Sequence, residues 1–159
     1  MKTVYVDLDG VMTDFYRGYK QVFGVEWLDI PISTDRWKNI NNTPGYFENL
    51  PLKDDALELW DFIDTIPNIH VRILTSTGWN EERNGKEKRA WCLKNLGVHG
   101  HNVITVTNIN KKHEHAHKEG ILIDDHEEAI DLWIEAGGDG ILHRNASSTI
   151  YDLSCRLIW

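Results

Sequence analysis

Short apolar runs rich in valine and isoleucine recur along the chain, and longer segments with helical spacing separate them. Residues 3–8 (TVYVDL) form the first run. Strands that alternate with helices of this length predict an α/β fold, with a doubly wound and mostly parallel sheet. Such a sheet carries helices on both of its faces. The predicted strands are residues 3–8, 70–75, 102–106, 121–124 and 139–143.

Three helices follow from the apolar spacing and from capping residues. The first has Asp54 or Asp55 as its N-cap and ends before Pro67, and the second spans Lys86 to Leu96 before Gly97. The third ends at the pair Gly137-Gly138. Apolar residues at i, i+3, i+4 and i+7 mark the first helix (Ala56, Leu59, Trp60, Ile63), and three apolar residues mark the third (Ile130, Trp133, Ile134).

Residues 15–50 interrupt the alternation of strands and helices. This segment is too long for an ordinary connection between a strand and a helix. It is also rich in aromatic residues, most of which we expect to pack against one another. We therefore predict one domain over residues 1–159, with a core (1–14 and 51–159) and a small helical insertion above the sheet. The aromatic residues are Phe15, Tyr16, Tyr19, Phe23, Trp27, Trp37, Tyr46 and Phe47.

Composition narrows the classes of protein to be considered. The 159 residues carry a net charge of −8, which argues against a stable complex with nucleic acid through a basic surface. No apolar run reaches membrane-spanning length, so no membrane partner is expected. The start of the chain has no signal-peptide pattern, and Cys92 and Cys155 lack metal or redox spacing. We expect a cytoplasmic protein with reduced cysteines, and a homodimer remains open.

Polar residues follow three of the predicted strands at the point where each strand ends. Asp7 and Asp9 follow the first, Thr75 and Ser76 the second, and Asp124-Asp125 the fourth. Ligands bind at the carboxyl ends of parallel strands. Four carboxylates in one crevice repel one another unless a cation joins them, and oxygen ligands suit Mg²⁺ and a substrate phosphate. The acidic residues thus predict Mg²⁺, and Mg²⁺ predicts a phosphate ester.

These residue types also suit phosphoryl transfer. One carboxylate can attack phosphorus and a second can exchange protons with the leaving oxygen and with water. Hydroxyl and N–H groups at Thr75 and Ser76 can hold phosphoryl oxygens, and a lysine can neutralise their charge. Lys88 is the candidate lysine because it lies on the sheet-facing side of its predicted helix, in the first turn. Lys86 and Lys112 are the alternatives.

The order of these segments resembles the haloacid dehalogenase (HAD) superfamily of Mg²⁺-dependent phosphotransferases. DLDGV, ILTST, EKRAWCLKNLG and LIDD match its four motifs. Within it the chain looks most like the 5′(3′)-deoxyribonucleotidases, through DLDGVMTDF, YFENLPL and HRNAS. The resemblance implies Asp7 as nucleophile and Asp9 as acid/base. It further implies a metal site (Asp7, the Asp9 carbonyl, Asp125, with Asp124 in support), a phosphate site (Thr75, Ser76, Lys88) and an aromatic contact to substrate (Phe15).

The chain departs from that family at two points. Its 15–50 segment is shorter, and His126 follows LIDD where the family has arginine. Nucleoside selectivity is therefore open, with Phe15 and Trp37 as the expected substrate-contacting aromatics and Trp79 as a third candidate. The alternating His113, His115 and His117 are expected on a solvated helix or loop, with a transition-metal site as the alternative.

Two other functions are considered. A phosphatase of this kind can instead act on a polynucleotide 3′-phosphate or a sugar phosphate, although the acidic charge disfavours a long polyanion. A phospho-accepting signalling module also combines acidic residues, threonine and lysine on a doubly wound sheet. Such modules carry the acidic pair after the first strand and the phosphorylated aspartate after the third, and the order here is different.

Overall fold

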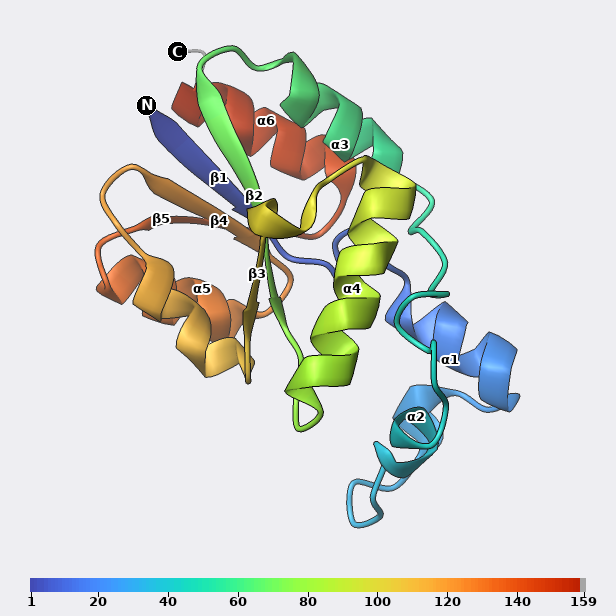
Figure 1. Ribbon diagram of the computed structural model, residues 1–159. Coiled ribbons are helices and arrows are strands. Elements are labelled where there is room, and N and C mark those ends of the chain that lie inside the picture. Colours follow the sequence, from blue (N-terminus) through green and yellow to red (C-terminus); the bar gives the residue numbers. More distant parts are fainter. Residues whose placement is uncertain (158–159) are drawn as a thin grey trace.

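The computed structural model describes residues 1–157, in which five parallel strands form one sheet in the order β3-β2-β1-β4-β5 (Figure 1). Every predicted strand is confirmed, to within two residues at each end. β1 lies at the centre, where Val4 pairs with Val71 of β2 and with Ile121 of β4. The strands are β1 (Lys2–Val6), β2 (Ile69–Ser76), β3 (Val103–Val106), β4 (Gly120–Asp124) and β5 (Asp139–Leu142).

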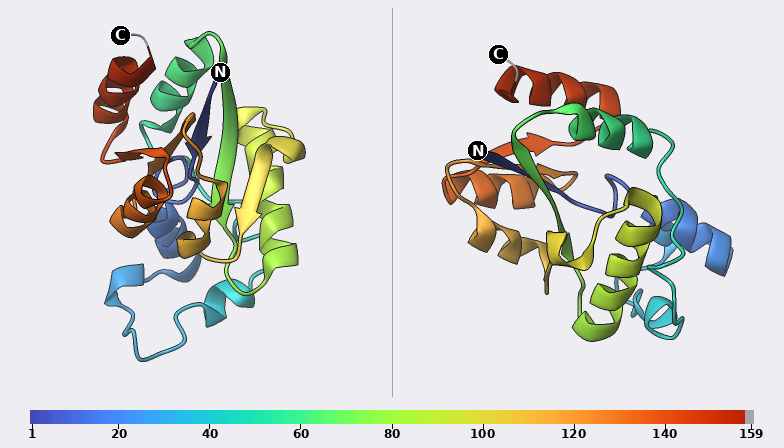
Figure 2. Two further views of the ribbon diagram at one scale, coloured as in Figure 1. Left: turned by 90° about the vertical axis from the view of Figure 1, so that its left-hand side faces the viewer. Right: turned by 45° about the horizontal axis from the view of Figure 1, so that its top comes forward.

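Helices cover both faces of the sheet, as the alternation predicts (Figure 2). Side chains of successive strand residues point to opposite faces. Val4 and Val6 therefore join the larger core, with α3 (Ala56–Thr65), α4 (Glu81–Leu96) and α6 (Ala146–Leu157). Tyr5 joins a smaller core on the other face, with α5 (Glu127–Glu135). The helix α6 was not among the predicted elements.

Helix α4 begins earlier than predicted. Asn80 is its N-cap and accepts a hydrogen bond from the Arg83 backbone, and Glu81 and Glu82 complement the dipole of the first turn. The predicted start at Lys86 is therefore wrong. Lys88 therefore lies about two turns inside the helix, and not in its first turn.

Residues 15–50 form a helical segment beside the carboxyl ends of the strands (Figure 1). The expected aromatic cluster is present: the Phe15 and Trp27 rings lie 5.1 Å apart, as do those of Tyr19 and Trp27. These aromatic residues pack against one another and are continuous with the larger core. Its helices are α1 (Phe15–Phe23), the 3₁₀-helix η1 (Trp27–Asp29) and α2 (Lys38–Asn41).

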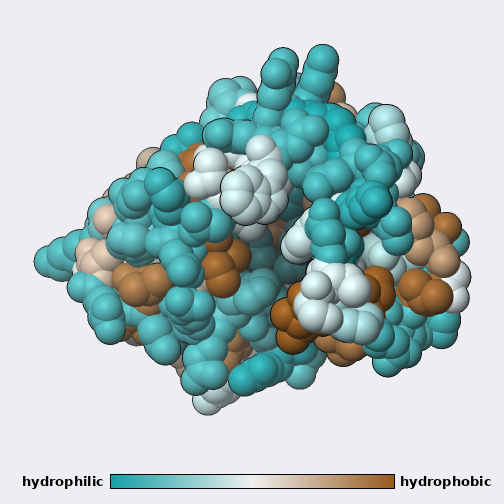
Figure 3. Space-filling model, turned by 90° about the horizontal axis from the view of Figure 1, so that it is seen from below, coloured by the Kyte–Doolittle hydropathy of each residue, from teal (hydrophilic) through white to brown (hydrophobic). Residues whose placement is uncertain are grey.

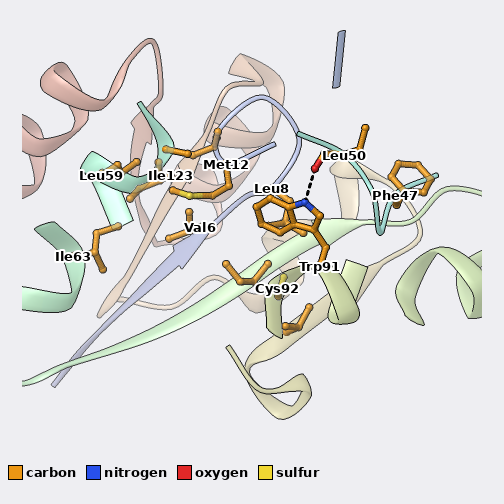
Figure 4. Packing of buried hydrophobic residues seen from close by; sticks show 14 of the residues in the cluster. Val6, Leu8, Met12, Phe47, Leu50, Leu59, Ile63, Trp91, Cys92 and Ile123 are labelled. Carbon is orange, nitrogen blue, oxygen red and sulfur yellow. Dashed lines mark hydrogen bonds between the residues drawn. The ribbon is translucent and has the colours of Figure 1, made fainter. Parts of the chain in front are cut away.

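A buried tryptophan joins this segment to the main core. The Trp91 ring of α4 is 1% exposed, and its Nε1 donates a 2.8 Å hydrogen bond to the Leu50 carbonyl (Figure 4). The same picture shows Leu8 next to the ring. Leu50 lies in the irregular stretch between α2 and α3, so this bond fixes where that stretch meets α4.

Neither cysteine is in a disulfide, in agreement with the sequence-based expectation. Cys92 is buried in the main core and Cys155 is exposed. Burial raises the pKa of the Cys92 thiol to about 12. Within residues 1–157, no helix has the length and apolar character needed to cross a membrane.

We predict that Trp91→Phe lowers the free energy of unfolding by about 2 kcal/mol, because the buried Leu50 carbonyl loses its donor. Urea denaturation measures the change. Trp79→Phe is the matched control, since Trp79 is 95% exposed. Equal midpoints for the wild type and Trp91→Phe would contradict the assigned role of this hydrogen bond.

We predict that the native protein at pH 8 reacts with one equivalent of a thiol reagent, at Cys155. A pKa near 12 leaves Cys92 as the unreactive thiol at that pH, and the folded core excludes the reagent. Two equivalents should react in urea. Rapid labelling of Cys92 in the folded protein, located by peptide mass spectrometry, would be inconsistent with its burial.

Candidate active site

The predicted polar residues lie close together at the point in the sheet where the strand order changes direction. From β1 the chain adds β2 and β3 on one side, and β4 and β5 then lie on the other. Between β1 and β4 the loops diverge and leave a crevice, the usual ligand site of an open parallel sheet. Asp7 follows β1 and Asp124 ends β4 at this point. The lower face of the molecule, towards which β2 runs, is hollowed (Figure 3).

A buried lysine joins the two strand ends. Lys112 Nζ lies 2.7 Å from Asp7 Oδ1 and 2.6 Å from Asp124 Oδ2. The lysine comes from the 3₁₀-helix η3 (Ile109–His115) and is 0% exposed. Although burial favours the neutral amine, the two carboxylates raise the pKa of Lys112, so its charge is retained. Lys112 thus offsets part of the repulsion between Asp7 and Asp124.

Asp7 nevertheless remains in an environment that disfavours its charge. Burial, followed by the neighbouring Asp124 charge, raises the pKa of Asp7 to about 7, against the opposing effect of Lys112. Burial also works against the charge of Asp124. There, however, Lys112 and hydrogen bonds from His126 dominate and hold the pKa of Asp124 below its usual range. The excess of negative charge is therefore felt most strongly at Asp7.

A second buried lysine forms an ion pair with Asp9, the other aspartate of the DLDG motif. Lys88 Nζ lies 2.6 Å from Asp9 Oδ2 and donates to Thr75 Oγ1 at 3.1 Å. Thr13 donates to the other oxygen of Asp9 at 2.7 Å. The Lys88 ammonium also lies 4.6 Å from the centre of the Phe47 ring. Asp7 and Asp9 therefore have separate lysine partners.

The carboxylates next to Asp7 form a group that can bind a divalent cation. Ligand atoms of Asp7, Asp124, Asp125 and His126 lie within 4.8 Å of one another. Asp125 Oδ1 is buried, and His126 Nδ1 lies 3.2 Å from it as an ion-pair partner. A Cβ atom at Gly10, where φ is +89°, would come within 2.1 Å of Asp125 Oδ2, so only glycine lets this carboxylate approach the loop. These observations fit a cation that takes its ligands from oxygen.

The charge of the site also favours a divalent cation. Four carboxylates face two ammonium groups and the His126 imidazolium, which leaves one negative charge in excess. His126 lies on the solvent side of the group, and its hydrogen bonds to Asp124 and Asp125 raise the pKa of the imidazole to about 10. Nitrogen ligands are uncommon for Mg²⁺. The oxygen atoms of Asp7, Asp124 and Asp125 are thus the better candidate ligands.

Two adjoining cavities open beside the carboxylates. One has a volume of about 460 Å³ and is lined by Asp7, Asp125, Phe15 and others, and the second, of about 600 Å³, extends past Lys88 and Phe47. Cavities of this size suit small organic ligands. The residues that line both cavities are Asp9, Trp37, Ser76 and Ile109.

The structure brings together most of the residues predicted from sequence. The side chains in mutual contact or in the acidic group are Asp7, Asp9, Thr75, Lys88, Asp124 and Asp125. Ser76, Phe15 and Trp37 line the cavities, and Trp79 lies on the rim, almost fully exposed. Among the three candidate lysines, Lys86 is exposed, whereas Lys88 and Lys112 are both buried in the site. The sequence-based choice of a single lysine was therefore incomplete.

Sequence reasoning named one site residue only as an alternative and gave another no role. The first is Lys112, in the charged stretch KKHEHAH. The second is Thr13, which binds Asp9 and lies within the quoted motif. A threonine directly after the apolar Val11-Met12 pair was the available signal.

The three alternating histidines do not join the acidic group of the described residues. His113 and His115 are half-buried in the 3₁₀-helix η3, and the exposed His117 follows it.

Comparisons with known proteins place the fold. No protein-family model matches the chain. No curated protein matches it either. A HAD-superfamily hydrolase from Ehrlichia chaffeensis superposes with a TM-score of 0.57 at 20% identity, over 100% of both chains. A hydrolase from Streptococcus pneumoniae TIGR4 gives 0.57 at 14% identity, over 97% of this chain and 100% of that chain.

A third solved structure is that of a HAD family enzyme from Bacteroides thetaiotaomicron, in complex with magnesium and inorganic phosphate. It has a TM-score of 0.52 at 14% identity, over 91% of this chain and 95% of that chain. At these identities the likeness establishes the fold. The chain has the α/β fold of HAD hydrolases, with an acidic group at the carboxyl ends of its strands.

We predict that Mg²⁺ raises the melting temperature relative to EDTA. A ligand at 100 times its dissociation constant stabilises the native state by about 2.7 kcal/mol. Asp125→Asn should remove most of this increase, because one carboxylate of the acidic group is lost. Asp131→Asn, at an exposed position of α5, is the control. Identical melting curves in Mg²⁺ and EDTA would exclude the site.

Proposed function

We propose that the protein is a Mg²⁺-dependent phosphomonoesterase that acts through an aspartyl-phosphate at Asp7. The observation that carries this proposal is the separation of Asp7 from Asp9. Asp7 lies in the acidic group with Lys112, whereas Asp9 is held outside it by Thr13 and Lys88. Two carboxylates with different surroundings can take different chemical roles.

Asp7, Asp125 and Asp124 would hold the metal. When bound, Mg²⁺ supplies positive charge that draws the phosphoryl oxygens towards Asp7 and compensates the excess negative charge of the site. Asp125 would contribute a carboxylate that contacts His126 Nδ1 at 3.2 Å and, among the described residues, makes no ion pair with either lysine. The assignment of the carbonyl oxygen of Asp9 as a further ligand rests on the resemblance to the HAD superfamily.

In the first step, an oxygen of Asp7 attacks phosphorus and the bond from phosphorus to the ester oxygen breaks. Asp9 gives its proton to the departing oxygen, so an alcohol leaves and an acyl-phosphate remains on Asp7. Lys112 binds Asp7 Oδ1 at 2.7 Å and so orients the carboxylate. Among the described residues, no hydrogen bond is made to Asp7 Oδ2, which makes it the better candidate for attack.

In the second step, Asp9 takes a proton from a water molecule as that water attacks phosphorus. The bond between phosphorus and the Asp7 oxygen breaks, and inorganic phosphate and free Asp7 result. Thr13 and Lys88 each bind one oxygen of Asp9, so its carboxyl group keeps one orientation through both steps. An aspartate in this position also distinguishes the proposed enzyme from a long-lived phosphorylated signalling module.

The phosphoryl group would lie between the two lysines and the end of β2. Lys88 and Thr75 already contact each other at 3.1 Å, and Ser76 lines both cavities. A cation and hydroxyl groups placed in advance stabilise charge on phosphoryl oxygens without reorganisation. We assign Lys88, Thr75 and Ser76 to phosphate binding, and Lys112 to the orientation of Asp7.

The substrate that we propose is a deoxynucleoside or nucleoside monophosphate, as for a 5′(3′)-deoxyribonucleotidase. The ring centres of Phe15 and Trp37 lie 5.8 Å apart, and both residues line the same cavity as Asp9. They offer aromatic surface to a base. The cavity volumes of about 460 and 600 Å³ suit a nucleoside. The specific link to nucleotides rests on the sequence resemblance. Phosphate release from a panel of nucleoside monophosphates and sugar phosphates, with Mg²⁺, tests it.

We predict that Asp7→Asn abolishes phosphate release and that Asp9→Asn slows it by about 10²–10⁴-fold. The first variant lacks the nucleophile and the second lacks the proton donor and acceptor. Both should keep the wild-type circular dichroism spectrum, because neither residue packs in the core. Asp131→Asn is the control. Wild-type turnover by Asp7→Asn would remove Asp7 from the mechanism, and an unchanged rate in Asp9→Asn would remove Asp9.

A further inference from the structure

A buried carboxylate outside the acidic group holds the 15–50 segment against α4. Glu87 lies on α4, one residue before Lys88, and is 7% exposed. Its Oε1 accepts the Gly45 backbone N–H at 2.7 Å, and its Oε2 accepts that of Phe47 at 3.0 Å. An ionised carboxylate is costly to bury unless both oxygens are satisfied. Here each oxygen has a backbone donor.

An arginine one turn earlier completes this contact. Arg83 donates to the carbonyl of Asn41 at 2.7 Å and to that of Ile40 at 3.1 Å, at the end of α2. Its Nε lies 3.6 Å from Glu87 Oε1, so the two side chains also partly neutralise each other. The anion thus holds N–H groups and the cation holds carbonyl groups of the same segment. We refer to Arg83 and Glu87 as the α4 clamp.

The α4 clamp sets the position of a ring that touches the site. Phe47, whose N–H binds Glu87, is 3% exposed, and its ring centre lies 4.6 Å from Lys88 Nζ. Lys88 therefore has the ring on one side and Asp9 and Thr75 on the other. A cation is attracted to the face of an aromatic ring, so a shift of the ring changes where the ammonium group rests.

We propose that Glu87 is a positioning residue, which acts through Phe47 to hold Lys88 on Asp9 and Thr75. This inference rests on the proposed function, since it gives the lysine a phosphoryl group to bind. Glu87 does not itself reach the carboxylates, because both of its oxygens face the backbone of residues 45–47. Its effect on phosphate binding is transmitted by one ring and one ammonium group.

The test measures the affinity for inorganic phosphate, with Mg²⁺ present, by calorimetry. Glu87→Gln keeps the shape of the side chain but places an NH₂ group against one of the two backbone donors. We expect phosphate to bind about 10-fold more weakly, and turnover to fall by a similar factor, since small misplacements of a catalytic group are costly. Glu82→Gln is the matched control, because it removes the same charge from an exposed position of α4.

The deciding measurement repeats Glu87→Gln in a Lys88→Met background. If Glu87 acts through Lys88, adding Glu87→Gln to Lys88→Met should change phosphate affinity and kcat/KM by no more than about twofold relative to Lys88→Met alone. The effects of coupled residues are not additive. An equal loss in both backgrounds would show a general structural role and overturn the proposal. Unchanged phosphate affinity in the single Glu87→Gln variant would overturn it as well.

Two further measurements cover a variant that does not fold and a protein that cleaves no ester. Should Glu87→Gln not fold, Phe47→Leu replaces it, because it removes the ring and keeps the α4 clamp. The same dependence on Lys88 is then expected, and its absence counts against the proposal. If the wild type binds phosphate but cleaves no ester, the proposed function fails, and the phosphate affinities still decide the role of Glu87.

Discussion

Four aspartates at one edge of a parallel sheet impose the constraint on which the rest of the structure depends. Parallel strands direct their carboxyl ends to the same edge, so DLDG after β1 and DD at the end of β4 come together whether or not their charges are compatible. Two buried lysines offset part of that charge. Burial, followed by the negative charge of Asp124, raises the pKa of Asp7, and the remaining excess of negative charge is why a divalent cation is expected.

The two buried lysines contact different groups in the crevice. Lys112 contacts Asp7 and Asp124, whereas Lys88 contacts Asp9 and Thr75. Helix α4, which carries Lys88, also contacts the core and the 15–50 segment. Trp91 on this helix packs in the core and binds Leu50, and the α4 clamp of Arg83 and Glu87 binds the segment that carries Phe47. The helix thus positions both Lys88 and the 15–50 segment.

The sheet and most of the site could be predicted from sequence, because their signals are local. A buried strand that ends in acidic residues places those residues at the ligand-binding edge of the sheet. The alternation of strands and helices predicts parallel strands, whose carboxyl ends all lie at that edge. The start of α4 could not be found in this way. Residues 81–85 of α4 (EERNG) include no apolar side chain, so no apolar stripe marks them, and Arg83 and Asn84 instead bind backbone carbonyls of Asn41 and Thr77.

The burial of Lys112 and Glu87 could not be predicted from the sequence either. Both lie in highly charged stretches that have the composition of solvated surface, yet each is at least nine-tenths buried. Lys111 and Lys86, close to them in sequence, are exposed. Composition cannot separate these neighbours, because burial here depends on partners far away in the chain, 105 residues for Lys112 and Asp7, and 40 for Glu87 and Phe47.

The most direct test of the account is to trap the phosphorylated aspartate. Asp9→Asn protein, mixed with substrate and Mg²⁺ and quenched in acid, should accumulate the intermediate because its hydrolysis is slow. Peptide mass spectrometry should then find one added phosphoryl group on the peptide that contains Asp7, and none when Asp7 is also Asn. Ester cleavage without any phosphorylated peptide, or a phosphoryl group on another residue, would contradict the account.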